Sequence, residues 1–104
     1  MKAILVNPKN RTIEMIEISE TEFLDDTYKA LNCDMIEGVY FDPNQNDVGY
    51  VDEEGRLKPE QHFMRVSGWP HPIANSMLIV GTDGEDDTDT TLSVKEVEDL
   101  ITFL

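Results

Sequence analysis

Hydrophobic and polar positions follow a strand-like pattern at the start of the chain. A continuous apolar run predicts a buried strand over residues 2–7. The β-branched residues of 12–18 predict a second strand, paired with the first as a hairpin. The apolar pair Met15 and Ile16 interrupts the alternation of this second strand, which predicts a bulge or burial on both faces at that point.

Two later stretches have the spacing of amphipathic helices. Apolar residues recur every three or four positions over 23–31, and Ser19 with Glu22 has the spacing of a capping box before them. Ser93 and Glu96 form a clearer capping box, and an apolar stripe continues from there to the end of the chain. The sequence therefore predicts one helix after the first hairpin and one terminal helix.

The middle of the chain is predicted to contain three more strands. Residues 35–41 and 48–52 have strand composition and flank a turn-rich loop, which indicates a second hairpin. The stretch 53–75 is irregular because it is rich in Pro and Gly, with a short helix expected over 59–63. Residues 76–80 form the last predicted strand, and the acidic loop after them leads to the terminal helix.

The predicted order of elements is β-β-α-β-β-β-α, which is typical of the α+β class. The chain has 104 residues, 39% of them hydrophobic, which is enough for one core and too few for two. We expect a single domain over residues 1–104, with two helices and one mixed or antiparallel sheet of about five strands. The open edges of such a sheet allow a homodimer.

The net charge of −14 restricts the classes of partner. It disfavours direct binding to nucleic acid or to an anionic membrane, because both need clustered Lys or Arg. The acidic residues form two blocks, 12–54 and 83–104, on either side of a weakly basic stretch. If the blocks meet in the fold, they form one negative face, and the acids first expected on it are Glu22, Asp25, Asp26, Asp83, Glu85, Asp86, Asp87 and Asp89.

This charge pattern favours a non-enzymatic protein-interaction protein. Rows of carboxylates can act as a nucleic-acid mimic and present a negative field to a basic nucleic-acid-binding protein of a host, as an antagonist would. An alternative is that the acidity serves only solubility, in a regulatory accessory protein of replication.

A third alternative places a small-ligand module or an enzyme in the segment 55–75. Its ligand would be anionic and would contact Arg56, Lys58 or Arg65. In the same segment Trp69, with His71 beside it, is either a rigid anchor for a partner or a plug over the core.

The sequence contains no recognisable catalytic or cofactor motif, so we predict no catalytic residues, no cofactor and no metal. Acidic neighbours of the single Cys33 raise a thiol pKa, which is the wrong direction for a nucleophile. Residues 42–53 partly match a calcium loop, but Asp47 stands where the glycine is needed. The acids of 82–91 could chelate a cation, although a solvated loop is the favoured interpretation.

The beginning of the chain determines the expected compartment. The apolar run before Pro8 is too short for a signal peptide, and no segment is long enough for a membrane span. A lone cysteine cannot form an internal disulfide. We therefore expect a cytoplasmic protein.

Four segments together resemble the domain-of-unknown-function family numbered 3846. They are Met1–Lys9, Tyr28–Glu37, Tyr50–Gly55 and the acidic stretch Ile79–Asp86 before the terminal helix. Members of that family are small proteins encoded by phages, plasmids and their bacterial hosts, so the resemblance implies a phage or mobile-element origin. The shared motifs concern the fold and bring no active-site residues with them.

Overall fold

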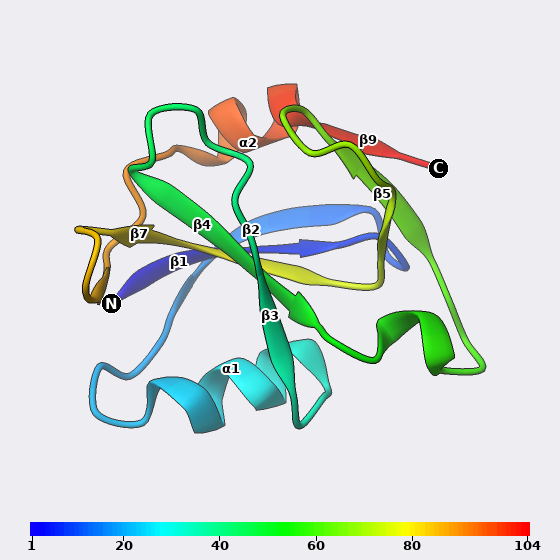
Figure 1. The fold of residues 1–104 in the computed structure, drawn as a ribbon, viewed down its shortest axis with the longest axis horizontal. Helices are drawn as coiled ribbons and strands as arrows, with labels where there is room; N and C mark the ends of the chain where they lie inside the picture. The colour runs from blue at the N-terminus through cyan, green and yellow to red at the C-terminus, as the bar shows by residue number, and fades with distance from the viewer.

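The main sheet of the protein forms the centre of the molecule (Figure 1). A computed structural model describes residues 1–104. Five strands lie in the order β2-β1-β7-β4-β3, every neighbouring pair is antiparallel, and β8 pairs with the end of β7. The strands are β1 (Lys2–Asn7), β2 (Thr12–Glu17), β3 (Ile36–Val39), β4 (Asp47–Asp52), β7 (Met77–Thr82) and β8 (Asp87–Thr88).

A second, smaller sheet and the helices cover this main sheet. The second sheet has the order β6-β5-β9 and is antiparallel throughout. The remaining elements are α1 (Phe23–Leu31), the short 3₁₀ helix η1 (Gly55–Leu57), β5 (Phe63–Val66), β6 (Ile73–Ala74), α2 (Val94–Leu100) and β9 (Ile101–Phe103). None of the helices has the length and apolar character needed to cross a bilayer.

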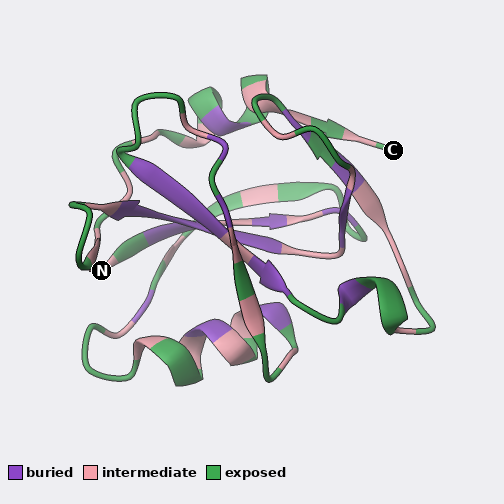
Figure 2. Cartoon of the chain, in the orientation of Figure 1, coloured by how far each residue is buried: buried purple, intermediate pink, exposed green.

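Both faces of the main sheet are buried, which explains its continuous apolar runs. Ile4 and Ile79 point to the face covered by the second sheet and by Val97 of α2. Ala3 and Leu78 point to the opposite face, which α1 covers. The buried residues therefore follow the central strands, while most of β2 and β3 at the two edges is more exposed (Figure 2).

The α+β class, the two helices and the mostly antiparallel pairing are confirmed. The second sheet is built from segments for which the sequence pattern predicted irregular structure or helix. β5 and β6 lie in the stretch expected to be irregular, and the short helix there is η1 at 55–57 instead of 59–63. The terminal helix ends at Leu100, because the next three residues, all of them β-branched or aromatic, pair with β5 as β9.

Two local predictions near the start of the chain differ from the structure. The pairing of β1 with β2 is unbroken from Lys2 to Asn7, so no bulge forms at Met15 and Ile16. The alternative of burial on both faces holds in part, because Ile13 packs against one core cluster and Ile16 against the other, while Met15 is exposed. The first capping box is also absent: Ser19 Oγ accepts a hydrogen bond from Glu22 N, and Ser19 N donates to Asp26 Oδ2. The second capping box, between Ser93 and Glu96, is confirmed in both directions.

Candidate functional site

Tyr50 of β4 connects the two acidic blocks of the chain. Its ring meets Phe23 of α1 edge-on, with the ring centroids 5.8 Å apart. Its hydroxyl donates a hydrogen bond to Asp87 Oδ1 of β8 at 2.7 Å. Burial, and then the bond to Asp87, raise the pKa of Tyr50, so the hydroxyl remains a donor at neutral pH. The start of α1 and the turn between β7 and β8 consequently lie at the same side of the molecule (left in Figure 1).

The turn between β7 and β8 has a defined conformation. Asp83 Oδ1 accepts hydrogen bonds from Glu85 N at 2.9 Å and from Asp86 N at 2.8 Å. These backbone donors lower the pKa of Asp83. Gly84 has φ of +98°, a conformation that glycine adopts without strain. The acidic loop expected over 82–91 is therefore a tight hairpin turn followed by β8.

Hydrogen bonds to neutral groups also hold the chain after this hairpin. Asp89 Oδ1 accepts from Lys2 N of β1 at 2.8 Å. The buried carboxylate of Asp47 accepts from Thr90 Oγ1 at 2.7 Å, from Thr91 N at 3.0 Å and from the Thr91 hydroxyl. Because these donors carry no formal charge, the bonds fix the backbone without forming an ion pair.

None of the eight acids singled out by the sequence forms an ion pair, since the carboxylates in the five ion pairs of the structure belong to other residues. Six of the eight are exposed, while Asp26 and Asp87 are half-buried and accept hydrogen bonds from Ser19 N and the Tyr50 hydroxyl. We call this set the acidic edge: Glu22, Asp25, Asp26, Asp83, Glu85, Asp86, Asp87 and Asp89.

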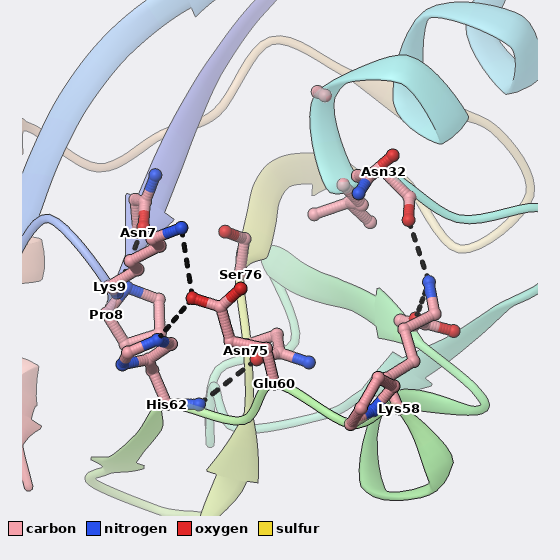
Figure 3. A pocket seen from close by; sticks show the side chains of 13 residues that line it. Asn7, Pro8, Lys9, Asn32, Lys58, Glu60, His62, Asn75 and Ser76 are labelled. Atoms are coloured by element: carbon pink, nitrogen blue, oxygen red, sulfur yellow. Dashed lines mark hydrogen bonds and ion pairs between the residues drawn. The ribbon is translucent and has the colours of Figure 1, made fainter.

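The second candidate site is a cavity of about 380 Å³ beside the end of α1 (Figure 3). We call it the polar cleft; its polar lining includes Asn7, Lys9, Asn32, Asp52, Lys58, Glu60, His62, Asn75 and Ser76. On one side, Glu60 Oε1 lies 3.0 Å from Lys9 Nζ and 3.1 Å from His62 Nε2. The hydrogen bond from His62, and then that from Lys9, lower the pKa of Glu60.

Lys58 occupies the other side of the polar cleft. Its Nζ lies 2.6 Å from Asp52 Oδ2 and donates to the Asn32 carbonyl oxygen at 2.8 Å. Asn32 caps α1 in a left-handed conformation, so the ammonium also neutralises the carbonyl end of this helix. The bond to Asp52 raises the pKa of Lys58. The cations of the cleft are thus already bonded to groups of the protein itself.

The three cations proposed for an anionic ligand do not converge. Lys58 lines the polar cleft, and Arg56 donates to the Pro72 carbonyl oxygen beside a different cavity. Arg65 is an exposed residue of β5 and lines neither cavity. The two histidines are likewise separated, with His62 in the polar cleft and His71 at the second cavity.

Trp69 and His71 line that second cavity together, which has a volume of about 350 Å³. Trp69 is half-buried and packs against the core cluster between the two sheets. Its ring therefore both covers the core and forms one wall of a cavity, while His71 is exposed at the rim.

Cys33 and the loop that begins at Asp42, the other candidates for chemistry, have local surroundings that account for them without a reaction or a metal. Burial, with Asp52 nearby, raises the pKa of the Cys33 thiol. The carboxylate of Asp42 accepts hydrogen bonds from the backbone N–H groups of Asn44, Asn46 and Asp47. This hairpin turn explains the partial match to a calcium loop. No three side chains of the His, Cys, Asp and Glu type are grouped as metal ligands.

One protein-family model matches a stretch of the chain that contains the residues of both candidate sites. A family model described as a domain of unknown function, DUF3846, matches residues 1–102. The chain belongs to this family. Searches of curated proteins and of solved structures gave no match. The family description assigns no reaction to either the acidic edge or the polar cleft.

The sequence pattern did not single out the residues that organise these sites. Tyr50 lies in a predicted strand, but its partner Asp87 is 37 positions away. In the sequence Asp47 stands out only at the glycine position of the partial calcium-loop match, whereas in the fold it accepts hydrogen bonds from Thr90 and Thr91. The triad of Lys9, Glu60 and His62 joins two turns that are distant in the sequence. The one local signal was the Thr90-Thr91 pair in the acidic loop, which offers hydroxyl donors where the chain has few cations.

Proposed function

We propose that the protein is a non-enzymatic interaction protein whose acidic edge binds a basic, nucleic-acid-binding protein. The observation that carries this proposal is that no cation of the chain pairs with any of the eight carboxylates. The edge therefore presents its full charge to a partner. A phage or mobile-element origin and an antagonist role in the cytoplasm fit this proposal, because such a surface occupies the groove that phosphates would otherwise fill.

The physical basis is electrostatic steering combined with a rigid presentation of charge. A row of uncompensated carboxylates raises the association rate with a Lys- and Arg-lined groove, and this effect weakens with salt. The hydrogen bonds of Asp83, Asp87 and Asp89 to the protein's own donors hold these groups in place before binding. Little ordering of the edge is then needed on association.

The polar cleft supports the small-ligand alternative less well. An anionic ligand there would have to displace Asp52 from Lys58 or Glu60 from Lys9. Since those carboxylates are part of the same fold and are present at high effective concentration, a free anion competes poorly with them.

The experiment is capture of partners from a lysate of the native host with three forms of the protein. The test variant is Asp83→Asn, Glu85→Gln and Asp86→Asn, which removes three exposed charges and keeps the side-chain shapes. The matched control is Glu14→Gln, Glu54→Gln and Glu98→Gln, which removes three exposed charges elsewhere.

We expect the wild type and the control to retain a basic nucleic-acid-binding protein at about 50 mM salt and to release it at about 500 mM salt. Duplex DNA should compete for that partner, and the test variant should lose it. If the test variant captures the same proteins as the control, the acidic edge is not the binding surface.

A further inference from the structure

β3 forms a free edge of the main sheet, in the foreground of Figure 1. The amide of Glu53 donates to the carbonyl oxygen of Met35 just before the strand. Hydrogen-bonded residues alternate along an antiparallel pair, so the backbone groups of Ile36 and Gly38 point away from β4. No turn or loop elsewhere in the chain forms a backbone hydrogen bond with these two residues.

The cavity lined by Trp69 lies beside this edge, on the face covered by the second sheet. Val39, Trp69 and Ile73 provide an apolar wall, and Glu37 and Glu53 are exposed carboxylates at the rim. Neither carboxylate is in an ion pair. Arg56 also lines the cavity, but its guanidinium donates to the Pro72 carbonyl oxygen and lies over the Phe63 ring. The apolar wall and the two rim carboxylates match a long side chain with an apolar stem and a cationic head.

The opposite face of the same edge presents an aromatic ring. Tyr40 follows β3 and has 74% of its surface exposed. Its ring lies over Gly38, where an added Cβ would be 2.8 Å from the tyrosine oxygen. The glycine therefore leaves room for the ring directly beside the free backbone groups.

We propose that β3 accepts an extended segment of a partner protein as an added antiparallel strand, with Lys or Arg at alternate positions. Its backbone pairs with Ile36 and Gly38, and its Lys or Arg stems pack against Trp69 while their cationic heads reach Glu37 and Glu53. Such strand addition combines backbone hydrogen bonds with pockets for alternate side chains. A second copy of this chain fits the edge poorly, because it would bring a second Glu37 to a rim that is already acidic. This surface is separate from the acidic edge, so the proposal does not depend on the proposed function.

The probe is a six-residue peptide with alternating Arg and Val, added to ¹⁵N-labelled protein and followed by NMR. In the proposed register the Val residues lie opposite Ile36 and Gly38, so their N–H groups face β3. Methylation of the backbone nitrogens of the Val residues should weaken binding about tenfold, because two backbone hydrogen bonds are lost. Methylation of the backbone nitrogens of the Arg residues gives a matched control, because those N–H groups point away from β3, and it should leave the affinity within about twofold.

Protein variants test the charge at the rim. Glu37→Lys with Glu53→Lys should weaken binding of the Arg-Val peptide about tenfold or more, since both head-group partners are reversed. Glu14→Lys with Glu98→Lys changes the net charge equally at exposed sites elsewhere and should have a much smaller effect. Asp83→Asn, Glu85→Gln and Asp86→Asn should preserve the shifts at Ile36 and Gly38, even if the partner-capture experiment fails.

Three results would overturn the proposal: no binding of the Arg-Val peptide, equal affinity for the two methylated peptides, or chemical shifts that move at the turn 83–86 and not at Ile36 and Gly38. The last result would indicate attraction to the net charge alone. Amide spectra of each variant before peptide addition confirm that it is folded.

Discussion

The acidic edge and the polar cleft both contain carboxylates that accept hydrogen bonds from the protein, but the donors differ. At the edge the donors are backbone amides and hydroxyls, as at Asp83 and Asp87. In the cleft the donors are cations, with Lys58 on Asp52 and Lys9 on Glu60. A neutral donor fixes a carboxylate and leaves its charge in place, whereas a cation removes the charge from the local field. The proposed interaction uses the carboxylates of the edge, whose charges no ion pair cancels, whereas Asp52 and Glu60 of the cleft are already paired.

The charge distribution along the sequence does not translate directly into charged surfaces of the fold. The weakly basic middle segment does not form one basic surface, because its cations do not converge: Lys58 pairs with Asp52 in the polar cleft, Arg56 lies beside the second cavity, and Arg65 lines neither cavity. Of its cations, Lys58 neutralises one acid of the first block, Asp52. The eight acids of the acidic edge have no such partners, so no ion pair cancels their charges.

The largest effect is expected from breaking the ion pair in the polar cleft. Lys58→Met leaves the Asp52 side chain, 4% exposed, without its cation. We expect a loss of about 2 kcal/mol in the free energy of unfolding; the value is reduced from that of a buried pair because Lys58 is partly exposed to solvent. Urea denaturation measures it. Adding Asp52→Asn to Lys58→Met should restore part of the loss, and no restoration would contradict the pairing.

The same pair predicts a pH dependence in the alkaline range. Asp52 raises the pKa of Lys58 in the folded protein, so the unfolded chain loses this proton first, near the ordinary value of about 10.4. The stabilisation is complete below that pH and falls as the pH rises toward the folded value. In Lys58→Met this part of the alkaline loss should be absent.

A smaller effect is expected from removing the hydrogen bond that joins the acidic blocks. Tyr50→Phe keeps the edge-on contact with Phe23 and loses the bond to Asp87. We expect a loss of about 1 kcal/mol in the free energy of unfolding, since Asp87 is half-buried and regains water when the bond is lost. Amide hydrogen exchange should accelerate at 83–87 and stay unchanged in α2. Unchanged exchange in the hairpin would mean that Tyr50 does not hold the edge.

The sequence predicted those parts of the fold that depend on local pattern. The apolar run of β1 and the capping box at Ser93 were recognisable because their partners lie within a few residues. The strand β9 was missed because its pairing with β5 overrides a helical stripe that continues to Leu104. The bulge predicted from the adjacent apolar residues Met15 and Ile16 is likewise absent, because β2 pairs continuously with its neighbour β1.

The candidate site was predictable only as a set of acids, and its arrangement was not. Segment charges indicated two acidic blocks, but whether they meet depends on Tyr50 and Asp87, which the sheet order brings together. The bonding of the cations in the middle segment was equally hidden, because Lys58 finds Asn32 at the end of α1, 26 positions away. Contacts of this kind follow from topology and have no local signature.

The smallest effect is expected at the exposed triad of the polar cleft, where pairing changes a pKa without changing stability measurably. His62, and after it Lys9, lower the pKa of Glu60, so this carboxylate stays charged to a lower pH than an isolated glutamate and loses its pairing as the pH falls through the lowered value. NMR titration should show the pKa of Glu60 rising toward the ordinary value in His62→Gln and, by a smaller amount, in Lys9→Gln. Both variants should unfold at the wild-type denaturant concentration, because exposed ion pairs contribute little. In contrast, neutralising Glu98, which has no cation partner, should leave the Glu60 titration unchanged. If Glu60 titrates normally in the wild type, Lys9 is free for a ligand, and the contrast between the cleft and the acidic edge no longer holds.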